Sequence, residues 1–204
     1  MNRFLAARPL RALAVPLLAL VAACGGSTPS GAQVTVGAPA PDFRLTAIDG
    51  RQVSLAGFKG KVVVLEWMNP NCPFSKHHSE ARTMQTTAAK HPDAVWLAIN
   101  STRSGHGDYL APEAYSKFLA ANGIDYPVLY DPDGKVGRAY GAKTTPHMYV
   151  IDAAGRLVYQ GAIDDDPGLK APTVNYVDAA LAALADGRSP EPATTKPYGC
   201  TVKY

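Results

Sequence analysis

Hydrophobic and polar positions follow two patterns along this chain, and these patterns predict its main elements. Dense runs of β-branched and aliphatic residues, bounded by turn-forming residues, predict buried strands over residues 61–67, 94–100 and 126–131. Apolar residues at helical spacing predict helices over residues 73–90, 112–122, 135–140 and 173–186. Strands and helices therefore alternate along the chain.

Turn residues complete this pattern. Asp49-Gly50 predicts a hairpin between two short strands in an extended N-terminal segment, residues 37–60. The sequence Ala153-Ala154-Gly155 predicts a second hairpin, between strands over 147–152 and 156–163. The last stretch, residues 187–204, is rich in Pro and polar residues and predicts an irregular tail. Together these elements predict an α/β fold in which helices flank both faces of a central mixed β-sheet.

The first 36 residues follow neither the strand pattern nor the helix pattern. Residues 1–23 carry three arginines and then a short apolar run that ends in small residues, which is typical of an export signal and too short to span a bilayer. Val21-Ala22-Ala23-Cys24 resembles a bacterial lipobox, which implies that Cys24 is lipidated; an ordinary signal cleaved near Ala23 is the alternative. Residues 24–36 are small and polar, as in a flexible tether.

These boundaries change how the charge is interpreted. The formal net charge is +3, but residues after position 23 include 17 basic and 17 acidic side chains. No basic run remains, so the sequence argues against a nucleic-acid partner. The prediction is an extracytoplasmic protein of the bacterial cell envelope, lipid-anchored on the periplasmic side, with a domain over 37–186 and a tail over 187–204. In such an oxidising compartment disulfides persist.

Cys72 is the main candidate for chemistry. It lies between the predicted strand 61–67 and Pro73, which suits the first turn of a helix. A thiol at a helix N-terminus meets free backbone N–H groups and the positive end of the helix dipole, which favour the thiolate. The alternative is a buried, inert cysteine.

The residues around Cys72 carry a family resemblance. The pattern W-x-x-x-x-C-P from Trp67 to Pro73, a helix, and then Thr145-Pro146 before a hairpin strand resemble the thioredoxin-like superfamily. Residues 41–67 resemble its redoxin group, which includes alkyl hydroperoxide reductase/thiol-specific antioxidant proteins and TlpA/ResA-like oxidoreductases. Residues 141–167 and the terminal YGCTVKY are similar to a peroxiredoxin-like subgroup with one active-site Cys. The resemblance covers about residues 37–203 and implies a thioredoxin-like fold.

The resemblance also implies roles for four further residues. Glu66, six positions before Cys72, matches a buried acid that moves protons in this superfamily, and strand alternation puts it on one face with Val64. The alternative is a surface-facing carboxylate. Thr145-Pro146 matches a cis-proline that presents its backbone to an extended substrate, with a trans turn as the alternative. Trp67 belongs to the same predicted substrate-binding set.

Ser75 departs from a dithiol motif, because it stands where a second Cys would complete Cys-x-x-Cys. Its hydroxyl can hydrogen-bond a Cys72 thiolate but cannot form a disulfide. Cys200 is the candidate resolving thiol, since a chain from Gly187 to Cys200 could extend roughly 45 Å at about 3.3 Å per residue. A free or structural Cys200, unconnected to Cys72, is the alternative.

The predicted function is therefore an envelope-anchored thiol–disulfide oxidoreductase that acts on a protein or small-molecule thiol or disulfide and needs no cofactor. One alternative is a peroxiredoxin-like peroxidase, although Leu65 and Asn69 stand where that family has its Pro and its hydroxyl. Another is a non-catalytic copper-binding protein that uses Cys72 with His147 and Met148. His77 and His78, and the acidic run 164–166, are interpreted as solvated residues with no metal site.

Overall fold

The computed structural model describes Met1 and residues 33–204, so Cys24 and the predicted export signal lie outside the described residues. A seven-stranded sheet has the order β2-β1-β5-β4-β3-β7-β8. The strands β3, β4 and β5 are parallel and the other pairs are antiparallel, so the sheet is mixed as predicted. Its strands are β1 (Arg44–Ala47), β2 (Gln52–Ser54), β3 (Val63–Trp67), β4 (Val95–Asn100), β5 (Val128–Tyr130), β7 (His147–Ile151) and β8 (Leu157–Gly161).

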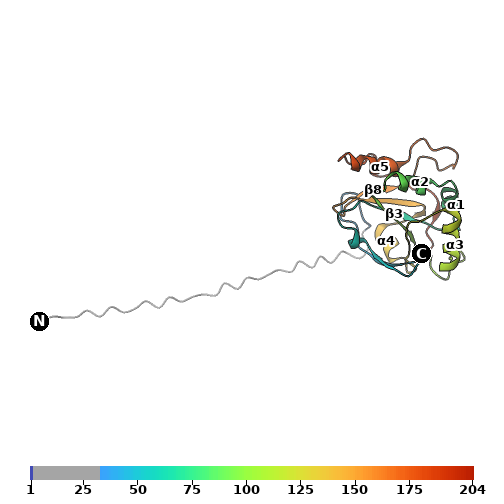
Figure 1. The fold of residues 1–204 in the computed structure, drawn as a ribbon, viewed down its shortest axis with the longest axis horizontal. Coiled ribbons are helices and arrows are strands. Elements are labelled where there is room, and N and C mark those ends of the chain that lie inside the picture. The colour runs from blue at the N-terminus through green and yellow to red at the C-terminus, as the bar shows by residue number, and fades with distance from the viewer. Residues whose placement is uncertain (2–32) are drawn as a thin grey trace. The chain divides into compact units, whose positions relative to one another are not determined.

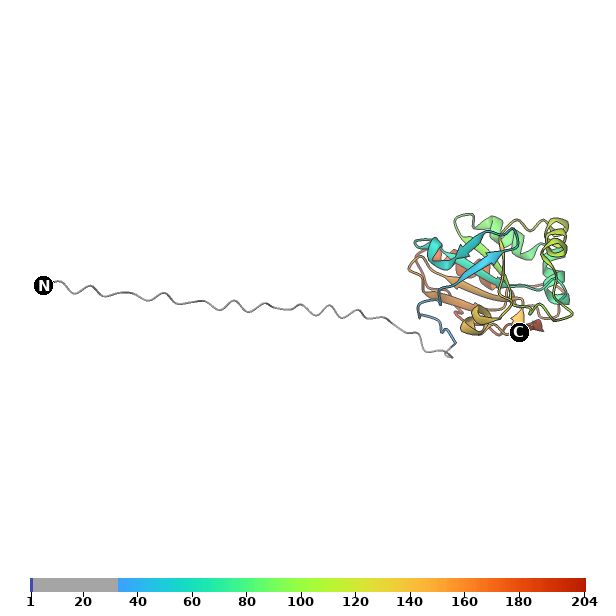
Figure 2. The ribbon, with the colours of Figure 1, turned by 90° about the horizontal axis from the view of Figure 1, so that it is seen from below.

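Helices cover both faces of this sheet, as the sequence predicts (Figures 1 and 2). In Figure 1, α2 and α5 lie above the sheet and α4 lies below β3. The described residues form the helices α1 (Pro73–Glu80), α2 (Thr83–Lys90), α3 (Pro112–Asn122), α4 (Lys135–Tyr140) and α5 (Tyr176–Ala185), with a 3-10 turn η1 (Leu55–Phe58). None of them is long and apolar enough to cross a membrane.

The hydrophobic core is divided by the sheet into two parts. On one face Val64 packs with residues of α2, α3 and α5, among them Met84, Leu119 and Leu181. On the other face Leu65 packs with residues such as Tyr140 of α4. The central strand β3 is buried along its whole length between β4 and β7, so the loop that leaves its C-terminal end starts from a fixed point.

Two elements differ from the prediction. The single helix predicted over residues 73–90 is wrong, because α1 ends at Glu80 and α2 begins at Thr83. Arg82 between them adopts the left-handed conformation, with φ of 56°, which interrupts the helical hydrogen bonds. The tail is also more ordered than predicted, since β9 (Cys200–Thr201) pairs with β6 (Thr144–Thr145) in a small antiparallel sheet.

Candidate active site

Cys72 is the N-cap residue of α1, with Pro73 in the first helical turn. Its carbonyl accepts the first helical hydrogen bond, from Lys76 N at 2.9 Å, and its own N–H donates to Asn69 O at 3.0 Å. The residue is only 3% exposed. The turn between β3 and α1 therefore fixes the backbone of Cys72 and brings its thiol to the helix N-terminus beneath the surface.

The surroundings of the Cys72 thiol favour the thiolate. In the neutral form Sγ donates a hydrogen bond to Thr145 O at 2.9 Å, a contact that stabilises the thiol and that the other interactions must offset. Burial raises the pKa of Cys72, but interactions with the Cys200 thiol, the Thr145 side chain and the backbone N–H groups of Ser75 and Cys200 outweigh it. The pKa of Cys72 therefore lies below its usual value, as for reactive cysteines.

Ser75 supports the thiol through its backbone rather than its hydroxyl. The residue is 1% exposed, and its Oγ accepts a hydrogen bond from Asn69 N at 3.4 Å. Its backbone N–H is the group that acts on the Cys72 sulfur. The Ser75 hydroxyl thus bonds the backbone of the turn before Cys72, and its contact with a thiolate or a substrate stays a prediction.

The Thr145-Pro146 peptide bond is cis, which confirms that prediction from the sequence. Thr145 lies in β6, and its carbonyl is the acceptor for the Cys72 thiol. The sequence predicts that this backbone docks an extended substrate. In the structure, however, β9 already pairs with it, and Thr145 stands opposite Cys200.

Cys200 is brought to Cys72 by this pairing, and both cysteines are free thiols. Gly199 makes the approach feasible, because it has a φ of 133° and a Cβ at this position would collide with Thr145 O. Unlike Cys72, Cys200 is only partly buried. Burial, together with the nearby Cys72 sulfur, raises the pKa of Cys200 to about 11. The two thiols thus differ in both exposure and acidity.

Glu66 faces the core that contains Val64, as strand alternation predicts. Its Oε2 accepts hydrogen bonds from Trp96 Nε1 at 3.2 Å and Tyr126 Oη at 3.0 Å. Burial raises the pKa of Glu66 to about 7, although both hydrogen bonds act in the other direction. The alternative of a surface-facing carboxylate is therefore wrong.

Trp67 points to the opposite face and is completely buried. Its ring lies against Tyr140 and Tyr149, with ring centroids 5.4 and 5.1 Å away, and its Nε1 donates to Ser101 Oγ at 3.0 Å. The structure therefore places Trp67 in the core and not at a substrate surface. Its size suited either role, so the sequence alone did not separate them.

A hydrogen-bonded group next to the site was missed in the sequence. His78, predicted to be solvated, is buried, and its Nε2 lies 3.0 Å from Tyr198 Oη. The Tyr198 hydroxyl in turn donates to Asp164, which is also buried despite the prediction of a solvated acidic run. The tail covers both side chains, and only a structure could reveal this because the contact joins residues 120 positions apart.

The described residues contain no group of three or more His, Cys, Asp and Glu side chains that could hold a metal ion. His147 is buried, and its Nδ1 accepts from Lys143 N and lies 3.1 Å from Tyr149 Oη. Burial, followed by the charge of Lys143, lowers the pKa of His147 to about 3. The Nδ1 atom of this imidazole is thus engaged in the fold.

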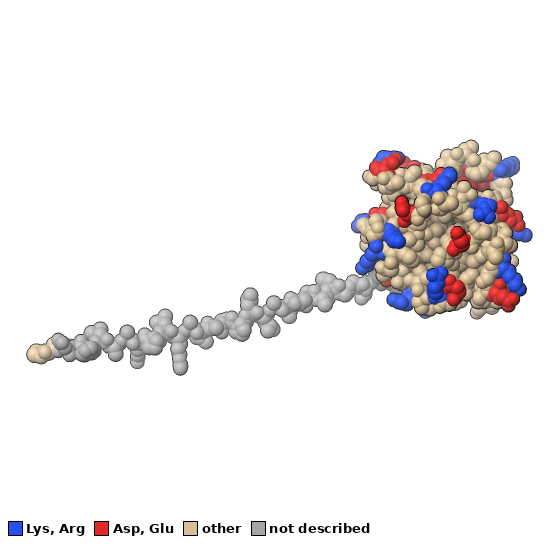
Figure 3. Space-filling view, viewed as in Figure 1, with Lys and Arg blue, Asp and Glu red and all other residues tan. Residues whose placement is uncertain are grey.

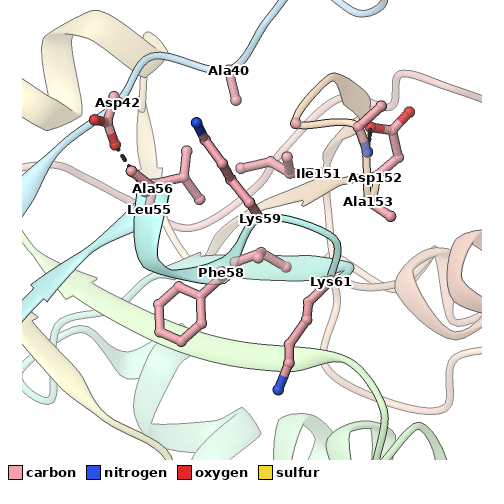
Figure 4. A pocket seen from close by; sticks show the side chains of 13 residues that line it. Ala40, Asp42, Leu55, Ala56, Phe58, Lys59, Lys61, Ile151, Asp152 and Ala153 are labelled. Carbon is pink, nitrogen blue, oxygen red and sulfur yellow. Dashed lines mark hydrogen bonds between the residues drawn. The ribbon is translucent and has the colours of Figure 1, made fainter.

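Basic and acidic side chains are interspersed on the face shown in Figure 3. A pocket of about 480 Å³ lies at the start of β3, at the opposite end of that strand from Cys72. Figure 4 shows it lined by residues such as Phe58, Lys59 and Ala153, and none of them belongs to the Cys72 site.

Known proteins resemble this chain in sequence and in fold. The model of the AhpC/TSA family matches residues 36–160. Thiol-disulfide oxidoreductase ResA of Bacillus subtilis (strain 168) is 26% identical over 125 residues, which are 61% of this chain and 66% of that protein. A Mycobacterium tuberculosis protein, provisionally named a peroxiredoxin, is 29% identical over 141 residues, or 66% of this chain and 81% of that one. The chain thus spans only part of the length of these relatives.

Two solved structures confirm the α/β thioredoxin-like fold. An uncharacterised conserved protein from Geobacillus kaustophilus superposes with a TM-score of 0.75 and is 33% identical, covering 84% of this chain and 93% of its own. The exposed lipoprotein thioredoxin of Streptococcus pneumoniae strain TIGR4 superposes with a TM-score of 0.50 and is 26% identical, covering 72% and 99%. The central mixed sheet with helices on both faces is therefore the fold that the resemblance implied.

Proposed function

We propose that this chain, which belongs to the AhpC/TSA family of redoxins in the thioredoxin-like superfamily, is an extracytoplasmic thiol–disulfide oxidoreductase whose redox couple is Cys72 and Cys200. One observation carries the proposal. The β6–β9 pairing puts Cys200 opposite Thr145, and the carbonyl of Thr145 accepts the hydrogen bond of the Cys72 thiol. A second thiol is thus present beside Cys72 even though Ser75 cannot supply one.

The proposed reaction moves two electrons from the protein to a disulfide. The Cys72 thiolate attacks one substrate sulfur, and the other sulfur leaves as a thiolate. Cys200 then loses its proton and attacks the Cys72 sulfur, which releases the second substrate thiol and forms the Cys72–Cys200 disulfide. The direction can be reversed by an external thiol. Burial of Cys200 opposes the loss of its proton that this step requires.

Glu66 is the candidate for buffering protons near this site. A carboxyl group with a pKa of about 7 exchanges protons readily at neutral pH, which is the property that general acid–base residues need. Its two hydrogen bonds go to Trp96 and Tyr126 and not to a cysteine. Glu66 is therefore assigned an indirect role. Its ionisation would affect the cysteines electrostatically across the core and not through a direct hydrogen bond.

Peroxide reduction is the second candidate function, and the burial of Cys72 favours it. A sulfur that is 3% exposed is more easily reached by a small peroxide than by a protein disulfide. The thiolate would attack the peroxide oxygen, giving a sulfenic acid and an alcohol or water. The Cys200 thiol would then close the disulfide and release water. Asn69, in place of the hydroxyl of peroxiredoxins, uses its amide to bond Thr102 and Asn71 instead.

Export and lipidation at Cys24 belong to the same proposal. They are supported by the basic and apolar pattern of residues 1–23 and by the lipobox-like sequence before Cys24. The similarity to an exposed lipoprotein of S. pneumoniae agrees with this. Metabolic labelling with a fatty acid, compared between the full chain and Cys24→Ala, tests it; equal labelling of both would overturn lipidation at this residue.

A peptide map of the oxidised protein tests the redox couple. The mature chain is oxidised with a slight excess of peroxide or of a dithiol-derived disulfide, and then digested with pepsin in acid so that disulfides do not exchange. A peptide linked through Cys72 and Cys200 is the expected product. Oxidation of Cys72 alone, with Cys200 still a free thiol, would overturn the proposed couple.

A further inference from the structure

The backbone at Thr145, which the sequence predicts to dock a substrate, is occupied by the protein's own tail. The strand β6 has β9 as its partner, in a register that pairs Thr144 with Thr201 and Thr145 with Cys200. An extended polypeptide would need the same backbone groups to add a strand here. It would therefore have to displace β9 first.

The tail is fixed on both sides of β9. Before the strand, Tyr198 donates to Asp164, lies 3.0 Å from His78 Nε2 and packs against Phe74. After it, Val202 N donates to Lys143 O at 3.1 Å, and Tyr204 Oη donates to Ala142 O at 2.8 Å. These contacts, whose side-chain hydrogen bonds are part-buried, must break before the edge of β6 becomes free.

The two sulfurs differ in accessibility. Cys72 is 3% exposed and lies against Thr145 of β6, whereas Cys200 is partly exposed on β9. An external thiol therefore meets the Cys200 end of a Cys72–Cys200 disulfide first. Attack there releases Cys72, whose thiolate is stabilised by the backbone N–H of Ser75 and so is the better leaving group.

We infer that external thiols attack the oxidised protein at the Cys200 sulfur. We also infer that the pairing of β9 with β6 limits these attacking thiols to those of low molecular weight. The inference rests on the proposed Cys72–Cys200 couple. A small thiolate forms a bond with Cys200 Sγ, the Cys72–Cys200 bond breaks, and Cys72 takes the electron pair. A second small thiolate attacks its partner on Cys200, which gives the oxidised small disulfide and two protein thiols. Two electrons pass from the small thiols to the protein.

Acid-quenched peptide mapping tests where the thiol enters. Oxidised protein, shown beforehand to contain the Cys72–Cys200 linked peptide, is mixed with glutathione, stopped in acid within a fraction of a turnover and digested with pepsin. Glutathione on the Cys200 peptide is expected, while glutathione on the Cys72 peptide would overturn the inference and leave the couple intact. If the linked peptide never forms, the couple itself fails and the inference fails with it.

A comparison of reductants tests the restriction by β9. The wild-type disulfide is reduced either by glutathione or by an unstructured peptide with one Cys of matched pKa. Glutathione should be faster by about tenfold or more, since the peptide cannot pair with β6. Equal rates, or a faster peptide, would overturn the restriction whatever the variants do.

Gly199→Ala then tests the cause of that restriction. The new methyl group would collide with Thr145 O and unseat β9, so the rate ratio should fall toward one and part of the adduct should move to Cys72. Gly105→Ala is the matched control, because its Cβ would meet open space and its ratio should stay at the wild-type value. Circular dichroism establishes that both variants fold. A folded Gly199→Ala variant with an unchanged ratio and adduct position would contradict the role of β9.

Discussion

Two cysteines of the same chemistry lie in opposite kinds of environment. Cys72 follows the central buried strand β3 and caps α1, whereas Cys200 lies on a two-residue strand held by the tail. Burial opposes ionisation at both, but hydrogen bonds lower the pKa of Cys72, while the Cys72 sulfur adds to the raised pKa of Cys200. The connection between β3 and α1 favours the Cys72 thiolate, and β9 leaves Cys200 partly exposed to solvent.

In a Cys-x-x-Cys motif one short helical segment must supply both a nucleophile and a resolving thiol. In the proposed couple the two tasks fall to residues 128 positions apart in the chain, which the β6–β9 pairing brings together. The motif would then work without its second cysteine. The predictions below test this division of roles.

Removal of either cysteine should have the largest effect and should separate the two roles. Cys72→Ser should lose all turnover, because the activated sulfur is gone. Cys200→Ser should still react once at Cys72 and then stop as a sulfenic acid or mixed disulfide. Pre-steady-state measurement of one equivalent of product per protein checks this. Sustained turnover by Cys200→Ser at the wild-type rate would show that the resolving thiol comes from elsewhere.

Glu66→Gln should remove a pH dependence of stability that originates in the core beneath β3. The carboxyl has a pKa of about 7 in the folded protein and an ordinary value of 4.5, so its contribution is complete below about pH 4.5 and is lost as the pH rises through 7. The loss in wild type is about 3 kcal/mol at 1.36 kcal/mol per pKa unit. Urea denaturation at pH 5 and pH 8 measures it. Buried His147, with its pKa lowered to about 3, changes the stability of both proteins over the same range. The assignment is therefore tested by the difference in stability between variant and wild type, which should change by about 2–3 kcal/mol between these two pH values; a difference independent of pH would contradict it.

Tyr198→Phe should loosen the tail without touching either sulfur. The change removes the partner of His78 Nε2 and one of the two donors to Asp164 Oδ1, at a cost of about 1–3 kcal/mol. Hydrogen exchange should accelerate at residues 198–204, and alkylation of Cys72 should become faster. Tyr130→Phe is the control, because its hydroxyl bonds Leu110 O instead of a residue of the tail. Equal exchange in both variants would show that Tyr198 does not hold β9.

The sequence predicted β3 and the start of α1 better than it predicted β9 and the tail, for a physical reason. The apolar run of β3 and Pro73 after Cys72 act locally, so the strand, the helix start and the face of Glu66 could be inferred. The burial of His78 and Asp164 depends on where the tail docks, and a two-residue strand such as β9 has no period to detect. The break at Arg82 also leaves no trace, because apolar spacing continues on both sides.

Ser75→Ala should have the smallest effect, and it separates two ways of stabilising the Cys72 thiolate. A hydroxyl directed at the sulfur would make the variant raise the Cys72 pKa clearly. In the structure the hydroxyl accepts a long hydrogen bond from Asn69 N, and the backbone N–H acts on the sulfur. Because alanine keeps that N–H, the thiolate absorbance at 240 nm should titrate within about 0.5 pH unit of wild type. A rise of a full unit or more would mean that the hydroxyl, and not the helix backbone, replaces the missing cysteine of the motif.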